Sequence, residues 1–292
     1  MSLGISDARP CSIQPIVIIG AGRSGTKFIR DLLATSSQVA AIPFDVNYVW
    51  RYGSETVESD VLLTDSLTEE TRRFIRRTLL RLAKTGSSSE TRVLVEKTVS
   101  NCLRVDYVNA VVPEARYLHL IRDGRAVAES ARRVWTQAPS RGYLWRKLQY
   151  FPWRNYRYAL WYINNLIRSG SRQRVWGPRY PGIQQDLATV DLLEVCARQW
   201  KECVVSADRS LKMMPKDKVL QLRYEQLVTD ESVLDRITDF CGVSDKNSPK
   251  EKYRSTVDIK NLTKWEHRLS RSEISRMNKS IGDVLQAFGY SV

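Results

Sequence analysis

The sequence contains few of the residues that build disulfide frameworks and metal centres. Five cysteines and two histidines occur among its 292 residues. The cysteines are odd in number and include no Cys-x-x-Cys pair, so neither a disulfide framework nor a structural zinc site is expected. Because His119 and His267 are the only histidines, a histidine-rich metal centre is excluded.

Long apolar stretches are also absent. No run of about 18 apolar residues is present, and the sequence therefore predicts no membrane span. The N-terminal residues MSLGISDARPCSIQ lack the basic segment and the following apolar stretch of a secretory signal peptide. These absences favour a reducing, cytoplasmic setting. A chain from which a membrane anchor had been removed would give the same pattern.

What the sequence has in excess is positive charge. Lysine and arginine number 46 against 32 aspartate and glutamate residues, which gives a formal net charge of +14 at pH 7. Such a field attracts nucleotides, nucleic acids, acidic glycans and anionic membrane surfaces, and charge alone does not choose among them. The apolar fraction of 42% is ordinary for a soluble globular protein.

Alternating strand and helix patterns predict an α/β fold. The expected strands are 15–19, 39–42, 93–95, 117–121 and 219–222, and the expected helices are 26 to about 35, 69–84, 125–135, 187–208, 232–241 and 273–287. Such alternation is typical of a parallel β-sheet flanked by helices. We therefore expect one domain over residues 15–292, preceded by a polar tail over residues 1–14.

An aromatic-rich segment interrupts this pattern. Residues 142–186 carry many tyrosines and arginines beside four tryptophans, which are Trp145, Trp153, Trp161 and Trp176. One interpretation is an amphipathic helical insertion whose aromatic side chains pack on the core. The other is a wall of an acceptor-binding site, because aromatic faces and arginines suit sugars and anionic groups. The two interpretations are compatible with each other.

The strongest local signal is a glycine-rich turn between a strand and a helix, residues 16–33, IVIIGAGRSGTKFIRDLL. Backbone N–H groups and the positive end of a helix dipole converge there, an arrangement that binds phosphate. Gly20 and Gly25 have the spacing of a Walker A loop. The next two residues, Thr26 and Lys27, follow in the reverse order, which displaces the lysine and the hydroxyl that would hold Mg²⁺. Glu96 imitates a Walker B acid only weakly.

The same residues resemble the 5′-phosphosulfate-binding loop of sulfotransferases that use 3′-phosphoadenosine-5′-phosphosulfate (PAPS). That family has a P-loop NTPase-like fold and donates a sulfuryl group where kinases donate the γ-phosphate. The resemblance implies that PAPS is the donor, that 3′-phosphoadenosine-5′-phosphate (PAP) is released, and that the loop residues contact the nucleotide. These residues are Arg23, Ser24, Gly25, Thr26, Lys27 and Phe28.

A second motif, ARYLHLIRDGRAVAESAR at residues 115–132, resembles the 3′-phosphate-binding motif of the same family. A predicted strand ends at Ile121, Arg122 follows at its tip, and Ser130 lies within the next predicted helix. Arginine offers a planar fork of donors that matches phosphate oxygens. The resemblance implies that Arg122 and Ser130 hold the 3′-phosphate.

Three shorter matches extend the resemblance toward the end of the chain. Residues 96–98, Glu-Lys-Thr, are similar to a segment of the branch that contains tyrosylprotein and carbohydrate sulfotransferases. Residues 223–225, Arg-Tyr-Glu, and residues 264–265, Lys-Trp, also resemble that branch. The implied nucleotide contacts in these stretches are Tyr224, Lys264 and Trp265.

The resemblance also implies catalytic roles. Arg23 aligns with the catalytic cation of the loop and would stabilise charge on the bridging oxygen and the departing sulfuryl group. Lys97 would supply a second positive charge, or else form a salt bridge at a strand end. Asp45 lies where that branch carries a glutamate base and is the candidate general base, or else a capping residue of a turn or helix. A sulfate monoester carries less charge than a phosphate, so no metal is required.

These observations predict a sulfotransferase that moves a sulfuryl group by in-line displacement onto an acceptor hydroxyl. Charge and aromatic content favour an acidic glycan or polysaccharide as acceptor, and a peptide tyrosine stays open. The alternative enzyme is a P-loop kinase or NTPase, which would need Mg²⁺ with ATP. A nucleic-acid-binding module is suggested by charge alone and lacks a known reader motif, so no nucleic-acid partner is expected. An inactive sulfotransferase fold that only binds is disfavoured by the presence of Arg23, Arg122 and Ser130.

Overall fold

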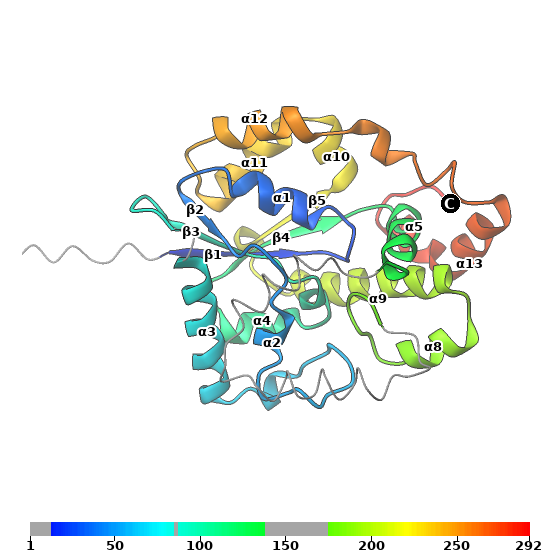
Figure 1. The fold of residues 1–292 in the computed structure, drawn as a ribbon, viewed down its shortest axis with the longest axis horizontal. Helices are drawn as coiled ribbons and strands as arrows, with labels where there is room; N and C mark the ends of the chain where they lie inside the picture. The colour runs from blue at the N-terminus through cyan, green and yellow to red at the C-terminus, as the bar shows by residue number, and fades with distance from the viewer. Residues whose placement is uncertain (1–12, 85–86, 138–174) are drawn as a thin grey trace, which may run out of the picture.

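The computed structural model describes residues 13–84, 87–137 and 175–292, and within them five parallel strands form one sheet in the order β2-β3-β1-β4-β5 (Figure 1). The strands are β1 (Gln14–Ile19), β2 (Val39–Ala41), β3 (Val93–Glu96), β4 (Arg116–Ile121) and β5 (Val219–Arg223). In the centre of the sheet Ile16 pairs with Val95 of β3 and with Arg116 of β4. All five strands expected from the sequence are present, and the parallel α/β fold is confirmed.

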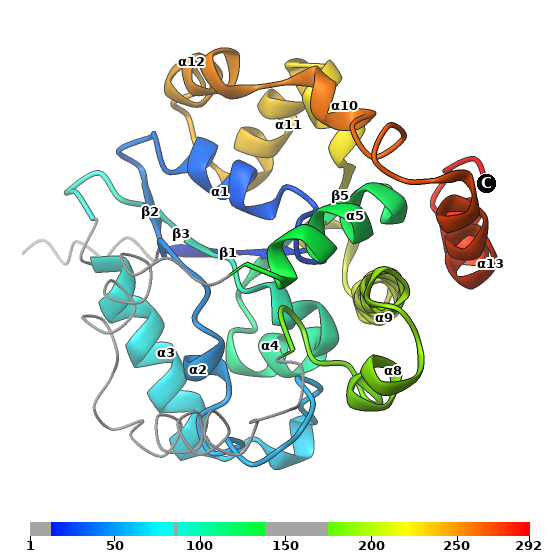
Figure 2. The same cartoon turned by 45° about the vertical axis from the view of Figure 1, so that its right-hand side comes forward.

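Helices cover both faces of the sheet, and each face has its own apolar core (Figures 1 and 2). On the face drawn above the sheet in Figure 1 lie α1 (Thr26–Leu33), α10 (Tyr224–Thr229), α11 (Ser232–Cys241) and α12 (Asn247–Thr256). On the other face lie α2 (Asn47–Trp50), α3 (Glu69–Lys84), α4 (Val105–Val111), α8 (Ile183–Thr189) and α9 (Leu192–Lys212). Two further helices, α5 (Gly124–Trp135) and α13 (Arg271–Ala287), pack against α9. Single 3-10 turns occur at Thr64–Ser66, Val99–Leu103, Lys216–Lys218 and Ile259–Leu262.

Burial on both faces of the sheet explains why the sequence of β1 is a continuous apolar run. Ile16 and Ile18 enter one core, whereas Val17 and Ile19 enter the other, because successive side chains of a strand point to opposite faces. A strand between two helical layers therefore needs apolar residues at every position.

The helix expected over residues 187–208 is two helices in the structure. α8 ends at Thr189, α9 begins at Leu192, and the backbone of Asp191 between them is extended. The Asp191 carboxylate accepts a hydrogen bond from the N–H of Glu194 (3.1 Å) and so caps a new helix. The prediction of one continuous helix was wrong because helical spacing continues across the break. Four helices of ten residues or fewer, α2, α4, α10 and α12, were also missing from the sequence prediction.

Most of the expected aromatic insertion, residues 142–174, lies outside the described residues, so its helical character stays a prediction. Its described end contains an irregular stretch with Trp176, followed by the start of α8. At the N-terminus, Gln14 belongs to β1 although the sequence assigned it to the tail. The four described cysteines, Cys102, Cys196, Cys203 and Cys241, are buried free thiols. None of the helices in the described part of the chain combines the length and the apolar character that crossing a membrane would require.

The chain leaves the neighbouring strands β1 and β4 toward opposite faces of the sheet. After β1 it enters α1, whose apolar residues join one core, and after β4 it enters α5, whose apolar residues join the other. In open parallel sheets such a divergence leaves a crevice at the carboxyl ends of the strands, where ligands bind. The glycine-rich loop and Arg122 both follow strands that end at this edge.

Candidate functional site

The glycine-rich loop, residues 20–25, turns sharply between β1 and α1. Gly25 has φ 94°, and a Cβ at this position would lie 2.4 Å from the ring of Tyr224, so only glycine fits. Arg23 also has a positive φ, 75°, which is unusual for a residue with a side chain. Since the backbone N–H groups of residues 26–28 form the first turn of α1, they have no partner within the helix. The loop thus presents N–H donors and a cation at the carboxyl edge of the sheet.

Arg122, which follows β4, binds this loop directly. Its Nη1 donates to the carbonyl oxygen of Arg23 (3.2 Å), and its Nη2 donates to the carbonyl oxygen of Asn261 (2.7 Å). The guanidinium also stacks over the ring of Tyr224, 4.3 Å from its centroid. Tyr224 therefore lies between Gly25 and Arg122, and three distant segments of the chain meet at one guanidinium.

A second contact joins the same two motifs. Nε of Arg23 donates a hydrogen bond to the hydroxyl of Ser130 on α5 (3.0 Å). The residues that the sequence assigned to two ends of a nucleotide, Arg23 with Arg122 and Ser130, are therefore neighbours in the fold.

This cluster is rich in donors and cations that lack acidic partners. Ser24 Oγ and Arg122 Nε are buried and have no hydrogen-bond partner among the described residues. Crowding of the Arg23 guanidinium by protein atoms, followed by the charges of Arg122 and Arg133, lowers the pKa of Arg23 from its ordinary value. An anion placed between these groups would satisfy the open donors and relieve the repulsion.

The backbone that carries Arg122 is held from two sides. The indole Nε1 of Trp200 donates to the carbonyl oxygen of Arg122 (3.0 Å), and the N–H of Asp123 donates to Oε1 of Glu225 (3.0 Å). Glu225 is in turn fixed by the hydroxyl of Tyr290, which donates to its Oε2 (2.9 Å). The position of Arg122 is thus set by side chains from α9, α10 and the C-terminus.

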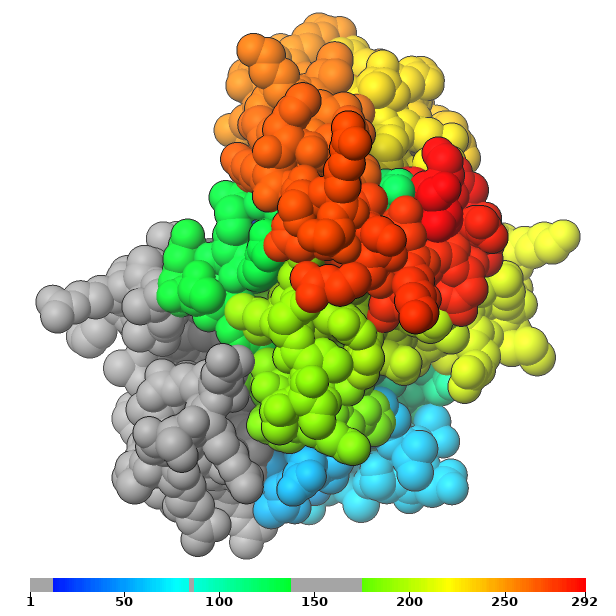
Figure 3. All heavy atoms as spheres, turned by 90° about the vertical axis from the view of Figure 1, so that its right-hand side faces the viewer, coloured from blue at the N-terminus to red at the C-terminus, as the bar shows by residue number. Residues whose placement is uncertain are grey.

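The C-terminal segment after α12 covers the same edge, and Figure 3 shows it (orange to red) beside α5 (green). Lys264 donates to Asp258 (2.9 Å) and to the side chain of Asn261 (2.7 Å), which shapes the turn whose carbonyl binds Arg122. The guanidinium of Arg125 lies 4.5 Å from the ring of Trp265. The lysine and tryptophan expected from the sequence therefore border the site, and in this structure they order its backbone.

The first three residues of α1, which the sequence assigned to the phosphate loop, point their side chains away from the cluster. Thr26 is buried against Gly20, and Phe28 lies 6.2 Å from the ring of Tyr253 in the core. Lys27 is exposed and forms an ion pair with Asp31 one helical turn later. Their contribution to an anion site would come from their backbone N–H groups.

Asp45 and Lys97 form an ion pair near the ends of the neighbouring strands β2 and β3. The loop that carries Asp45 is pinned on both sides. Arg30 donates to the carbonyl oxygen of Pro43 (2.7 Å), and the N–H of Val46 donates to the hydroxyl of Thr98 (2.9 Å). The structure thus joins the proposed base and the proposed second cation in one pair.

Glu96 is buried beneath this pair. Its carboxylate accepts hydrogen bonds from Trp50 (3.2 Å), Thr98 (2.5 Å) and Asn101 (3.0 Å). Burial raises the pKa of Glu96, and the nearby charge of Asp45 raises it further. Three protein donors therefore already occupy this carboxylate. One of them, the Thr98 hydroxyl, also accepts from Val46, so Glu96 helps to hold the loop that carries Asp45.

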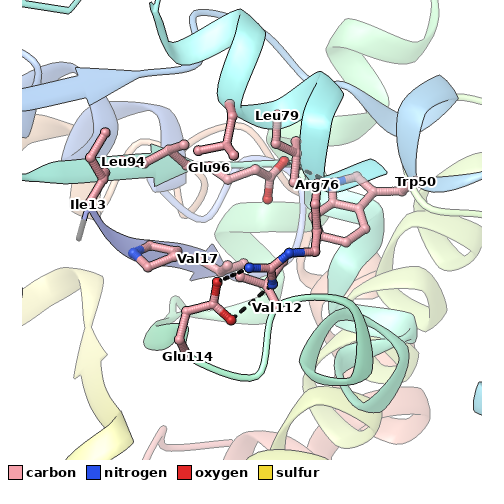
Figure 4. Close-up of a pocket in the computed structure, with 11 residues that line it drawn as sticks. Ile13, Val17, Trp50, Arg76, Leu79, Leu94, Glu96, Val112 and Glu114 are labelled. Carbon is pink, nitrogen blue, oxygen red and sulfur yellow. Dashed lines mark hydrogen bonds and ion pairs between the residues drawn. The ribbon is translucent and has the colours of Figure 1, made fainter. Parts of the chain in front are cut away.

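A cavity of about 60 Å³ lies elsewhere, between the sheet and α3, and is drawn in Figure 4. It is lined mostly by apolar side chains of β1, β3 and α3 and includes Ile13 and Pro15 at the start of β1. Ligand pockets usually enclose roughly 300–1,000 Å³. This cavity is therefore too small for a nucleotide.

The two histidines take no part in the cluster. His119 is buried in β4, pairs with Gln221 (3.3 Å), and has a pKa lowered by burial to about 4. His267 is exposed in the C-terminal segment.

Residues 15–163, just over half of the chain, match the sequence model of the Sulfotransferase family. The matched range contains the glycine-rich loop, Arg122 and Ser130. The chain belongs to the sulfotransferase family. Among curated protein sequences, none matches it.

Solved sulfotransferase structures have the same fold. The sulfotransferase domain of the olefin synthase of Synechococcus PCC 7002 is 16% identical with a TM-score of 0.52, and the match covers 97% of this chain and 98% of that one. A sulfotransferase from Alicyclobacillus acidocaldarius is 14% identical with a TM-score of 0.51, and 98% of each chain is covered. The sulfotransferase domain of the curacin biosynthetic pathway is 15% identical with a TM-score of 0.51, covering 98% of this chain and all of that one. At these identities the likeness extends to the fold alone.

Proposed function

We propose that this sulfotransferase moves a sulfuryl group from PAPS to an acceptor hydroxyl of a carbohydrate. The observation that carries the proposal is the guanidinium of Arg122, which bridges the glycine-rich loop and the C-terminal segment. A nucleotide with phosphates at both its 3′ and 5′ positions needs two anion sites at a fixed distance. In this proposal Arg122 with Ser130 forms one of these sites, and the glycine-rich loop with the start of α1 forms the other.

The residues present fit such a donor. The 3′-phosphate would contact Arg122 and Ser130. Nε of Arg122 has no hydrogen-bond partner among the described residues, and the Ser130 hydroxyl accepts a hydrogen bond from Arg23. The 5′-phosphosulfate would contact the first N–H groups of α1 and the Ser24 hydroxyl, which is buried and also lacks a partner. PAPS supplies a sulfuryl group attached to a phosphate leaving group. The tasks left to the protein are positioning and charge stabilisation.

Each of three side chains has a separate task in this proposal. Arg23 stabilises the negative charge that gathers on the bridging oxygen, and it stays protonated because an arginine donates its proton poorly. Asp45 accepts the proton of the acceptor hydroxyl. Lys97 leaves its ion pair with Asp45 and turns toward the transferring group, which frees the carboxylate to act as the base. No step requires a metal ion.

The acceptor belongs to the proposal as well. The net charge of +14 and Trp176, whose indole packs on Gly22 of the loop, favour a glycan over a small phenol. The branch resemblance also includes enzymes that modify peptide tyrosines, so an acidic tyrosine peptide is the comparison to test. A cytoplasmic location stays a prediction, and fractionation of the source cells would check it.

The experiment measures transfer of ³⁵S from labelled PAPS, with EDTA present, to a uronic-acid polysaccharide, an acidic tyrosine peptide and 4-nitrophenol. We expect labelled polysaccharide. The variant Arg23→Ala should lower the rate about 10²–10³-fold, the usual effect of removing one charge-stabilising donor. Arg73→Ala, which removes an exposed arginine paired with Glu69 on α3, is the control and should leave the rate unchanged. Labelling that needs Mg²⁺, or ³²P transfer from ATP in its place, would overturn the proposal.

A further inference from the structure

Two tryptophans lie beside the glycine-rich loop. The indole of Trp176 packs on Gly22, where an added Cβ would lie 3.2 Å from Trp176 Cη2. Trp135 is next to it, with ring centroids 6.4 Å apart and ring planes inclined by 50°. Both side chains are partly exposed. The two rings thus form an accessible aromatic surface one residue away from Arg23.

Helix α5 determines where this aromatic surface lies relative to the anion site. The helix starts directly after Arg122 and Asp123, carries Ser130, and ends at Trp135. At 1.5 Å per residue, Trp135 lies about 7–8 Å along the helix beyond Ser130. Arg122, the Arg23–Ser130 hydrogen bond and Trp135 therefore follow one another along one helix, and Trp135 lies on the side of that hydrogen bond away from Arg122.

The position of Trp176 is fixed from behind. The buried side chain of Gln199 on α9 donates to the carbonyl oxygens of Trp176 (2.9 Å) and Pro178 (2.8 Å). Gly177 between them has φ 77°, so the turn is specified by its glycine. The backbone that carries the Trp176 ring is therefore fixed before a ligand binds, which lowers the entropy cost of ordering it.

The shape and the charge of the surface select a class of ligand. Two rings inclined by 50° do not form a parallel slot for a flat phenol ring. A pyranose ring suits them better, since it offers an apolar C–H face to one indole and an edge to the other. Arg133 lies in the last turn of α5, where it pairs with Glu129 (2.7 Å) and its charge also acts on Arg23, so positive charge is present at this end of the helix.

We propose that Trp135 and Trp176 form the acceptor subsite and hold a pyranose ring of an acidic glycan, with the hydroxyl to be sulfated directed toward Arg23. The proposal rests on the proposed function, because it assumes that the donor occupies the Arg122 side of the cluster.

Calorimetric titration of the full chain saturated with PAP tests the subsite without turnover. The probes are a hexasaccharide that contains glucuronic acid, a neutral glucose hexasaccharide, an acidic tyrosine peptide and 4-nitrophenol. We expect the acidic hexasaccharide to bind best. Trp176→Ala should weaken its binding at least tenfold, and Trp135→Ala, which removes the second ring, should weaken it several-fold. The control Met213→Ala changes a highly exposed side chain and should have no effect.

PAP affinity is measured for every variant and should stay within twofold of the original protein. Failure of both hexasaccharides to bind, or unchanged binding in Trp176→Ala, would overturn the subsite. Preferential binding of the peptide or of 4-nitrophenol would overturn its assignment to a sugar. Failure of PAP itself to bind the original protein would overturn the proposed function, and this result is visible before any acceptor is added.

Discussion

Two groups of arginines lie in opposite electrostatic settings in this molecule. In the first group, Arg51 and Arg179 donate to the fully buried carboxylate of Asp60 at 3.1 and 3.2 Å. Arg104 reaches the same carboxylate through Asn47, which accepts from Arg104 and donates to Asp60 (3.1 Å). These positive charges have a buried acid at their centre.

The second group, Arg23 and Arg122, forms no ion pair within the described residues. Its direct partners are carbonyl oxygens, the hydroxyl of Ser130 and the ring of Tyr224. The buried carboxylate whose charge acts on Arg23, Glu129, is already paired with Arg133 and Arg268. The comparison separates two uses of arginine. A buried cation paired with a carboxylate serves the fold, whereas neighbouring cations without an ion-pair partner of their own are suited to a ligand that brings the negative charge.

The largest expected effect comes from removing the acid of the first group. Asp60→Ala leaves buried cations without their counter-charge, and we expect it to lower the free energy of unfolding by about 3–5 kcal/mol. Urea unfolding measures the change. Arg122→Ala, which removes two hydrogen bonds and a ring contact but strands no buried counter-charge, should lower the free energy of unfolding by only about 1–2 kcal/mol in the absence of ligand. Equal losses in the two variants would remove the distinction between the groups.

The acid group should also appear in the pH dependence of stability. Burial alone would raise the pKa of Asp60, but Arg179, Arg104 and Arg51 outweigh it, and the pKa falls from 3.8 to about 2. A lowered pKa stabilises the folded state above the unfolded value, so this contribution is complete above about pH 4 and is lost between pH 3.8 and 2. It amounts to about 2 kcal/mol. Urea unfolding of the original protein and of Asp60→Asn measures it, and parallel pH profiles of the two would contradict the assignment.

The smallest effect concerns the support of Arg122. Tyr290→Phe removes the hydroxyl that fixes Glu225 and thereby loosens the turn at Asp123. A hydrogen bond of this kind contributes about 1 kcal/mol, so PAP affinity should fall about fivefold. Binding of 5′-AMP, which lacks the 3′-phosphate, should not change. Tyr253→Phe removes a comparable hydroxyl, bonded to the carbonyl oxygen of Val228, and is the matched control. An equal loss of affinity for PAP and 5′-AMP would assign Tyr290 a general structural role.

Of the two groups of arginines, the sequence singled out only the second, Arg23 and Arg122. Arg23 and Arg122 each follow a recognisable buried strand, and the carboxyl ends of adjacent parallel strands meet at one edge. The Arg23–Ser130 contact spans 107 positions, yet both residues belong to motifs with a local signature. The five strands were predictable for the same reason, since each is a short apolar run.

The Asp60 group has no such signature. The carboxylate meets the backbone and side chain of Arg179, 119 positions away, through loops without regular structure. The break between α8 and α9 was missed because apolar spacing continues through it, and only the cap at Asp191 marks it. A motif also does not determine where each side chain points. The turn before Lys27 lies where the motif places it, yet the Lys27 amine pairs with Asp31.

Calorimetric titration of PAP into the full chain tests the central claim most directly, with 5′-AMP and ATP–Mg²⁺ as comparisons and Arg122→Ala as the variant. The account predicts that PAP binds in the presence of EDTA, more tightly than 5′-AMP, and that Arg122→Ala reduces the affinity for PAP about 10–100-fold, as expected for loss of a charge-assisted hydrogen bond worth about 1.5–3 kcal/mol. The affinity for 5′-AMP should be nearly unchanged in the variant. Equal affinity for PAP and 5′-AMP, or tight binding of ATP only with Mg²⁺, would contradict it.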